Sequence, residues 1–249
     1  MWGMLGPLYA HRLGRAYGPD SSAAALRGAL AAGVDGLESD VCLTADGALV
    51  LLHDPYLPLG TDLEGFAHER TARELRCARL RDRVGRLTAE APLFVEDLLA
   101  ATPRDVVIQL EVKAHADSAL AGRTVDALAE RLCGWTRGRR IEVLSFTAAA
   151  CARAAGLGCP ARLVVWADYA PRRWSAGPAG TESAGCVWST SCSRRRSSTR
   201  APRRVERYTG TLNEPALLDR VLPLRPDAVT SDRPHTLREA AAGVPSLAA

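Results

Sequence analysis

GLESDVCLTADGALVLLHD, residues 36–54, consists of two apolar runs into which acids and a histidine are set. The first run is predicted to be a strand, and Glu38 and Asp40 lie two residues apart on it, hence on the same face. The second run is predicted to be another strand, and it delivers His53 at its end. Polar groups placed at the ends of apolar strands are typical of an α/β fold with its site at one edge of the sheet.

The chain on either side continues this rhythm, with Val-, Leu- and Ile-rich runs alternating with alanine-rich helical stretches. Such alternation predicts a mostly parallel sheet, and 249 residues favour one closed TIM-type (β/α)8 barrel over residues 1–249. Asp20 or Ser21 is the expected N-cap of the first helix, and Gly33 its C-cap. The expected strands are Pro7–His11, Gly36–Val41, Ala48–His53, Val106–Lys113, Ile141–Phe146, Arg162–Trp166 and Asp227–Ser231, and the expected helices are Ser22–Ala32, Val95–Ala101, Ser118–Leu132, Ala148–Ala155 and Pro215–Leu222.

One stretch, residues 175–207, breaks the rhythm because Ser, Gly, Arg and Pro replace periodic apolar residues. It occupies the place where about one strand and one helix of a barrel are due. We therefore expect the barrel to be irregular or incomplete around residues 175–207, with the site residues still correctly placed.

Composition excludes several other classes of protein. Hydrophobic residues make up 47% of the chain and charged residues 24%, as in an ordinary globular protein. The net charge of +4 comes from one run, Ser193–Arg207, whose seven arginines and one acid sum to +6, so the remainder carries 4 − 6 = −2. A single basic run argues against nucleic-acid binding, which needs a basic face. The seven cysteines lack zinc-type pairing, and no signal peptide or membrane span is evident, so we expect a cytoplasmic protein.

Polar side chains recur at four predicted strand ends, which in a parallel barrel open into one mouth. Three carboxylates converging there would repel one another, and a divalent cation would remove that penalty. Oxygen ligands favour Mg²⁺ or Ca²⁺ over zinc. The competing interpretation, in which each acid caps a helix or pairs with an arginine, is stronger for any single acid than for the set. The side chains are His11 and Arg12, Glu38 and Asp40, His53 and Asp54, and Glu111 and Lys113.

The histidines and the single lysine can also be divided by whether they lie at the end of an apolar strand. His11 and His53 follow apolar strands, and two histidines beside a carboxylate cluster are what acid–base hydrolysis of a diester needs. Lys113 is the only lysine among 32 Lys and Arg residues, and a compact ammonium suits a tight site beside a carboxylate and a phosphoryl oxygen. The other histidines, which lie in polar surroundings and are expected at the surface, are His68, His115 and His235.

Taken together, the motifs resemble those of the glycerophosphodiester phosphodiesterases, whose barrel is of the phospholipase C-like type. HRLG, ESDVCLTADGALVLLHD and LEVK are similar to the family's HRG, E-x-D-V with a T-x-D-G turn, HD and E-x-K. TLNEPALLDRVL and PDAVTSDRP are similar to its closing segments, and the resemblance covers roughly residues 8–170 and 208–240. The departures are Leu13 for a glycine, PDSS for P-E-N-T, and YTGTLN for W-T-V-N.

The resemblance implies a metal held by Glu38, Asp40 and Glu111, acid–base catalysis by His11 and His53, and phosphate contacts from Arg12 and Lys113. It also implies hydrolysis of a small-molecule glycerophosphodiester to glycerol 3-phosphate and an alcohol. A substrate hydroxyl would attack phosphorus, and water would open the resulting cyclic phosphate.

Two alternatives remain open from the sequence. One is a related barrel lipase that cleaves lysophospholipid or sphingolipid head groups, although no aromatic-rich entrance loop is evident. The other is a non-enzymatic barrel that binds a phosphodiester or has lost its activity. The leaving alcohol, the choice between Mg²⁺ and Ca²⁺ and the oligomeric state are likewise left open by the sequence.

Overall fold

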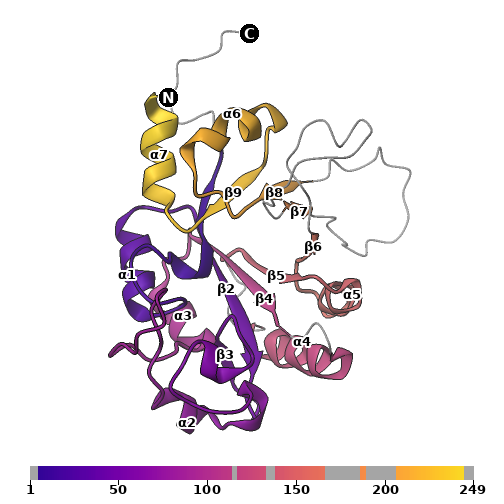
Figure 1. Ribbon diagram of the computed structural model, residues 1–249. Helices are drawn as coiled ribbons and strands as arrows, with labels where there is room; N and C mark the ends of the chain where they lie inside the picture. Colours follow the sequence, from indigo (N-terminus) through magenta and orange to yellow (C-terminus); the bar gives the residue numbers. More distant parts are fainter. Residues whose placement is uncertain (1–4, 114–116, 133–137, 166–185, 189–205, 244–249) are drawn as a thin grey trace, which may run out of the picture.

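The computed structural model describes residues 5–113, 117–132, 138–165, 186–188 and 206–243 and contains one nine-stranded sheet that closes on itself (Figure 1). The sheet order is β1-β9-β8-β7-β6-β5-β4-β2-β3, and β1 also pairs with β2, which joins all strands except β3 into a ring. This ring confirms the predicted TIM-type barrel. The strands are β1 Leu8–Ala10, β2 Gly36–Leu43, β3 Leu49–Leu51, β4 Val107–Val112, β5 Ile141–Ser145, β6 Ala161–Val165, β7 Cys186–Trp188, β8 Arg207–Thr209 and β9 Ala228–Ser231.

The strand β3 lies outside the ring, contrary to the expectation that it would be one of the parallel strands of the barrel. It pairs antiparallel with the end of β2, in the register Val41↔Leu51. The turn between them is closed by Thr44, whose Oγ1 donates to Asp46 and accepts from the backbone N–H of Ala48. This hairpin folds the chain back, so that the residue before His53 donates its N–H to the carbonyl of Asp40.

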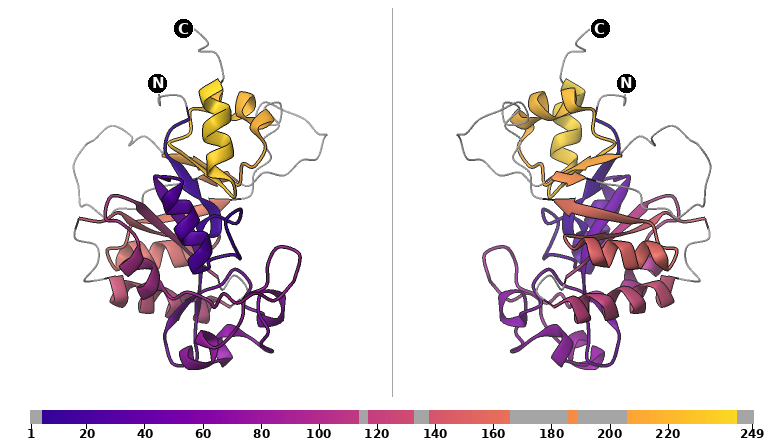
Figure 2. Two further views of the ribbon diagram at one scale, coloured as in Figure 1. Left: turned by 90° about the vertical axis from the view of Figure 1, so that its left-hand side faces the viewer. Right: turned by 90° about the vertical axis from the view of Figure 1, so that its right-hand side faces the viewer.

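Helices cover the outside of the ring, as the views in Figure 2 show. The first begins at Ala23, and its N-cap is Ser22 rather than Asp20 or Ser21, because the Ser22 hydroxyl accepts the N–H of Ala25. Gly33 follows its C-cap with φ 68°, in the left-handed region that favours glycine. The α-helices are α1 Ala23–Ala31, α2 Ala72–Arg76, α3 Val95–Ala101, α4 Ser118–Leu132, α5 Ala148–Gly156, α6 Leu218–Val221 and α7 Pro234–Gly243.

Short 3-10 helices occupy several connections. The helix expected over Pro215–Leu222 is instead a 3-10 turn, α6 and a second 3-10 turn. Pro223 in the second turn has no backbone N–H and cannot continue α6. The 3-10 helices are η1 His11–Leu13, η2 Leu57–Leu59, η3 Ala67–Glu69, η4 Pro215–Leu217 and η5 Leu222–Leu224.

Successive side chains along a strand point alternately out of the ring, into the apolar core beneath the helices, and into the ring. The outward face of β2 buries Leu37 and Val41 in the main core against α1, α3, α4 and α5. A second apolar cluster lies under the segment between β3 and β4, which forms a lobe at the end of the molecule opposite α7 (Figure 2). Among the described residues, no helix is both long and apolar enough to cross a bilayer.

The region around residues 175–207 departs from a regular barrel where the structure describes it. The three-residue strand β7 runs antiparallel to both of its neighbours, β6 and β8, whereas the other strands of the ring pair in parallel. The predicted irregularity is thus confirmed at β7. Neither β7 nor β8 was among the expected strands, because each is too short to show a period. The expectation for the rest of the segment lies outside the described residues.

A buried ion pair between β5 and β6 is extended across β7 by a hydrogen bond to β8. The Arg162 guanidinium on β6 donates twice to the Glu142 carboxylate on β5, over 2.5 and 2.6 Å. Arg162 also donates to the Tyr208 hydroxyl on β8, over 2.9 Å, and lies over that ring. Gln109 on β4 completes the network by donating to Glu142. These contacts connect β4, β5, β6 and β8, and the hydrogen bond to β8 spans β7, which pairs with β6 over only two residues.

We expect Arg162→Leu to lower the free energy of unfolding by about 3 kcal/mol, because it leaves Glu142 buried without its bidentate partner. The measurement is urea unfolding followed by circular dichroism. Arg140→Leu is the matched control, since Arg140 contacts the same carboxylate from a half-exposed position and should cost less than about 1 kcal/mol. Equal effects of the two variants would show that the buried pair adds nothing to the stability.

Candidate functional site

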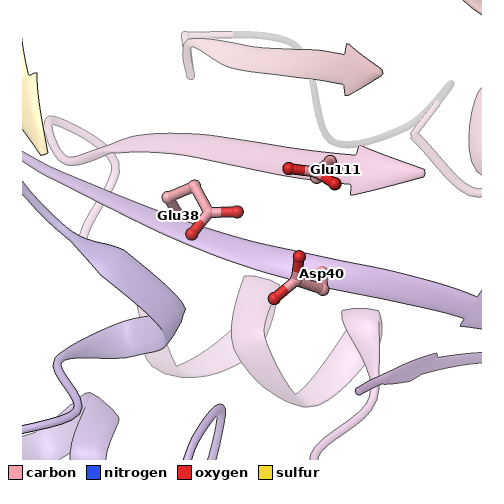
Figure 3. Close-up of side chains that lie close together, drawn as sticks. All are labelled: Glu38, Asp40 and Glu111. Carbon is pink, nitrogen blue, oxygen red and sulfur yellow. The ribbon is translucent and has the colours of Figure 1, made fainter. Parts of the chain in front are cut away.

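Three carboxylates face one another inside the ring (Figure 3). Glu38 and Asp40 alternate along β2 on its inward face, and Glu111 lies on β4 directly opposite Asp40 in the parallel register. Each of the three offers an oxygen atom, and these atoms all lie within 4.8 Å of one another. All three residues are buried. The structure therefore brings together the three acids that the sequence predicted as metal ligands.

Two cations contact this cluster. The ammonium group of Lys113 lies 3.0 Å from Oδ1 of Asp40 and 2.6 Å from Oε1 of Glu111. The Arg12 guanidinium lies 3.6 Å from the other oxygen of Asp40, Oδ2. That oxygen is buried and has no hydrogen-bond partner in the part of the chain that the structure describes. The arginine and lysine predicted as phosphate contacts are thus both at the cluster.

The pKa values follow from burial and from these neighbours. Burial, strengthened by Asp40, raises the pKa of Glu111 to about 7. Burial likewise raises the pKa of Glu38 well above its ordinary value, and the Asp40 and Glu111 charges add to the shift. Burial also opposes ionisation of Asp40, but the positive charges around it, that of Lys113 first and those of His53 and Arg12 with it, together outweigh burial and lower the pKa of Asp40. A further cation beside Glu38 and Glu111 would therefore favour their ionised forms and lower their pKa values.

The backbone after β1 turns sharply to place Arg12. Arg12, Leu13 and Gly14 have φ angles of 49°, 62° and 97°, all in the left-handed region. In this conformation the N–H of Arg12 donates to Glu38 Oε2 over 3.0 Å, and its guanidinium donates to Asp20 over 2.7 Å. The departure at Leu13 therefore falls where the backbone favours glycine. The Leu13 side chain is fully buried in the main core, and this burial offsets the strain.

His11 is oriented by a carboxylate that the sequence reasoning did not single out. Its Nδ1 lies 2.7 Å from Oδ1 of Asp232, while its Nε2 lies 3.9 Å from Oε2 of Glu38. Asn213 holds Asp232 in turn, donating from its amide to Oδ2 and accepting the Asp232 N–H. The signal was present, because Asp232 directly follows β9 and is an acid at a strand end like the others.

His53 reaches the same site from the hairpin. Its Nδ1 lies 3.1 Å from Oδ1 of Asp54, and its ring is part-buried. Burial, together with the positive charges of Arg12 and Lys113, lowers its pKa, so that His53 is neutral around pH 7 and able to accept a proton. All seven predicted site residues are thus gathered at one end of the ring.

The remaining histidines lie apart from this cluster where they are described. His235 is exposed and its Nδ1 lies 2.7 Å from the Tyr17 hydroxyl, while His68 is exposed beside Phe66. Both match the expectation of surface residues, and His115 lies outside the described residues.

A sequence profile described as "Glycerophosphoryl diester phosphodiesterase family" matches residues 11–236, most of the chain and all seven site residues. The chain belongs to this family.

Its fold agrees with those of solved structures at low sequence identity. A phosphodiesterase from Oleispira antarctica, solved in complex with the product sn-glycerol-3-phosphate, aligns over 96% of this chain and 98% of its own with a TM-score of 0.70 and 20% identity. The glycerophosphoryl diester phosphodiesterase domain of a Mycobacterium tuberculosis protein aligns over 94% and 98%, with a TM-score of 0.67 and 19% identity.

Closer sequence relatives match a shorter segment. A glycerophosphodiester phosphodiesterase of Caldanaerobacter subterraneus is 32% identical over 106 residues, which are 42% of this chain and 44% of the relative. The aligned part of the chain thus spans less than half the length of the curated relatives that it matches.

The charge balance of the site fits a divalent cation in this family member. Three ionised carboxylates against Arg12 and Lys113 leave one negative charge in a buried space. A divalent cation would bring the total to +1, and a singly charged phosphodiester would bring it to zero. The donor set is entirely oxygen, as Mg²⁺ and Ca²⁺ prefer. The Oδ2 atom of Asp40 makes no hydrogen bond within the described residues and is an oxygen that such an ion could bind.

We expect the metal-free protein to lose stability as the pH rises from about 4.5 to 7. Glu111 has an ordinary pKa of 4.5 and a folded-state pKa of about 7, so across this window the folded state binds more protons than the unfolded state. The loss for one such group is up to about 3 kcal/mol. Asp40 does not interfere, since its lowered pKa places its transition below pH 4.

The measurement is thermal unfolding in chelator between pH 5 and 8, comparing wild type with Glu111→Gln, which should reduce the dependence, while the part due to Glu38, whose pKa is also raised, should remain. Glu239→Gln, at an exposed position, is the control and should leave it unchanged. An identical pH dependence in Glu111→Gln would contradict the raised pKa of Glu111.

Proposed function

We propose that the chain hydrolyses glycerophosphodiesters to glycerol 3-phosphate and an alcohol, using a bound Mg²⁺ or Ca²⁺ ion and acid–base catalysis by His11 and His53. The observation that carries the proposal is the cluster of three buried carboxylates flanked by these two histidines, in a chain that belongs to the family. The relative solved with sn-glycerol-3-phosphate supports the choice of product.

Arg12 and Lys113 would bind the phosphodiester. Both stand at the inner carboxylates, Lys113 buried and Arg12 part-buried, so their charges are poorly screened by water and would act strongly on a phosphoryl oxygen. Asp20 holds the guanidinium of Arg12 from the opposite side, over 2.7 Å. The arginine is therefore oriented before a substrate arrives, which reduces the entropy lost on binding.

His11 and His53 would move the protons. Asp232 accepts the Nδ1 proton of His11, which leaves Nε2 as the atom that takes or gives a proton on the cluster side. Asp54 stands in the same relation to His53. One histidine would take the proton of the attacking hydroxyl while the other gives a proton to the leaving oxygen. Their roles would reverse when water opens the cyclic phosphate.

Glu38, Asp40 and Glu111 would hold the divalent ion. When bound, the ion would offset negative charge on the phosphoryl oxygens and lower the pKa of a coordinated hydroxyl. The carboxylates would hold it near Lys113 and Arg12, and together these groups would balance the charge that develops on the phosphoryl oxygens in the transition state. The cytoplasmic location and the absence of nucleic-acid binding stay predictions from the sequence.

The proposal is tested first by assaying release of glycerol 3-phosphate from glycerophosphodiesters with and without chelator. We expect chelation to abolish hydrolysis and Mg²⁺ or Ca²⁺ to restore it, because the three acids repel the substrate when no cation is bound. Full activity after exhaustive chelation would refute the metal assignment, and no activity under any condition would refute the proposed reaction.

The acid–base assignment predicts that His11→Ala and His53→Ala each lower kcat by roughly two to four orders of magnitude. His235→Ala serves as the matched control, since this exposed histidine also lies close to a hydrogen-bonding side chain but lies outside the cluster. Steady-state kinetics with metal present makes the comparison. Similar kcat values for all three variants would remove the histidines from the mechanism.

Lys113→Arg tests whether the lysine supplies shape as well as charge. The Nζ atom of Lys113 lies between two carboxylate oxygens, at 3.0 and 2.6 Å. A planar guanidinium is larger and would push these carboxylates apart by about 1 Å. We expect about a hundredfold loss of kcat with little change in melting temperature. Arg27→Lys, at an exposed position, is the reverse substitution and should be neutral. Wild-type kcat in Lys113→Arg would mean that only positive charge is needed there.

A further inference from the structure

Arg15, which lies in the connection between β1 and α1, shares a carboxylate with Arg12. Its Nε donates to Oδ1 of Asp20 over 2.7 Å, and Nη1 of Arg12 donates to the other oxygen, Oδ2, also over 2.7 Å. One arginine is therefore bound to each oxygen of Asp20. The three side chains are between 15% and 27% exposed, so these contacts are only partly screened by water.

The backbone holds Asp20 beside Arg12. The N–H of Ser21 donates to the carbonyl of Arg12 over 2.9 Å, which closes the loop directly after Asp20. Ser21 is fully buried, and its hydroxyl oxygen lies 2.8 Å from that of Ser39 on β2. What the backbone leaves free is rotation of the Asp20 carboxylate, and Arg15 restricts that rotation by donating to Oδ1.

The rest of the Arg12 guanidinium faces the carboxylate cluster. Its Nε lies 3.6 Å from Oδ2 of Asp40, which is too far for a hydrogen bond. Both atoms are buried, and neither has a hydrogen-bond partner among the residues that the structure describes. A buried donor without an acceptor is unfavourable, and a phosphoryl oxygen that accepted this N–H would remove the cost. The Nε–H of Arg12 is thus a donor that a bound phosphate could use.

Without Arg15, the guanidinium of Arg12 would have a competing arrangement. A guanidinium and a carboxylate form a contact of two parallel hydrogen bonds when both oxygens of the carboxylate are accessible. Loss of Arg15 would free Oδ1 of Asp20, so Arg12 could bind both oxygens. That contact would rotate the guanidinium and move its Nε away from the cluster. With Arg15 in place, Arg12 donates to one oxygen of Asp20 only.

The second contact of Arg15 is weaker. Its Nη1 lies 3.9 Å from Oδ2 of Asp232, the carboxylate that orients His11. The amide of Asn213 already donates to that oxygen over 2.7 Å. Loss of Arg15 should therefore leave His11 in place and affect mainly Arg12.

We propose that Arg15 is a positioning residue for substrate binding, which keeps the Nε–H of Arg12 directed at the phosphate by occupying Oδ1 of Asp20. The proposal rests on the proposed function, in which Arg12 binds the phosphodiester. Arg15 acts through Asp20 and takes no part in the transfer of protons.

The first test is steady-state kinetics of Arg15→Gln with a glycerophosphodiester and metal present. We expect KM to rise about tenfold, the scale of one side chain that must be ordered when the substrate binds. We expect kcat to change by less than about threefold, because the histidines keep their partners. An unchanged KM, or a fall in kcat alone, would overturn the proposal.

Arg153→Gln is the matched control. Arg153 on α5 forms an exposed pair with Asp126 on α4, in which two nitrogens donate to the carboxylate over 2.6 Å each. The variant removes an arginine–aspartate pair outside the site, so KM and kcat should both stay at the wild-type values. An equal rise of KM in Arg153→Gln and Arg15→Gln would show a general effect of lost stability and would overturn the proposal.

A double-mutant cycle tests the route through Asp20. Asp20→Ala removes the carboxylate that both arginines share, so Arg15→Gln should raise KM no further in that background. Equal factors for Arg15→Gln with and without Asp20 would show that Arg15 acts directly on the substrate, and would overturn the proposal.

Binding of glycerol 3-phosphate in the presence of Mg²⁺, measured by calorimetry, does not depend on turnover and so separates this proposal from the proposed function. We expect Arg15→Gln to bind about tenfold more weakly than wild type and Arg153→Gln to bind equally well. That result would support the role of Arg15 even if no diester were hydrolysed. Equal affinities of wild type and Arg15→Gln, or no binding by wild type, would overturn it.

Discussion

The structure depends on the burial of three carboxylates, Glu38, Asp40 and Glu111, against two cations inside the ring of strands. Burying like charges so close together is costly, and Lys113 and Arg12 offset only part of that cost. The consequence is visible in the pKa values, because burial raises those of Glu38 and Glu111 while the cations hold that of Asp40 down. A site with this imbalance is prepared to bind a cation, and its stability and its proposed activity are coupled through the same charges.

The surrounding fold accepts local strain to keep that arrangement. The turn after β1 carries a leucine with φ 62°, which costs about 1 kcal/mol, and in return directs the N–H of Arg12 at Glu38. Burial of the Leu13 side chain contributes more than that cost. Around the short strand β7, the Arg162–Glu142 pair connects β6 to β5 and the Arg162–Tyr208 hydrogen bond connects β6 to β8. The barrel therefore positions its site although one strand of the ring is short and reversed.

Much of this could be predicted from the sequence, because the apolar strands are long enough to show a pattern and the polar residues stand at their ends. The bounds of α3 and α4 match the prediction, and β2 and β4 deliver their acids as expected. The direction of β3 could not be deduced, because the run Leu49–Leu51 is apolar whether it pairs parallel or antiparallel. Three-residue strands such as β8 carry no period. Asp232 also follows an expected strand, but its role as the partner of His11 could not be deduced, because that contact spans 221 positions of sequence.

The central claim, that the carboxylate cluster needs a divalent cation, is tested most directly by isothermal titration calorimetry of Mg²⁺ and Ca²⁺ into chelator-treated protein at pH 8. We expect one ion to bind per chain and binding to be lost in Asp40→Asn, whose fold is checked by circular dichroism. We also expect weaker binding at pH 5.5, where Glu111 is protonated. Absence of binding by the wild-type protein, or unchanged binding in Asp40→Asn, would contradict this claim.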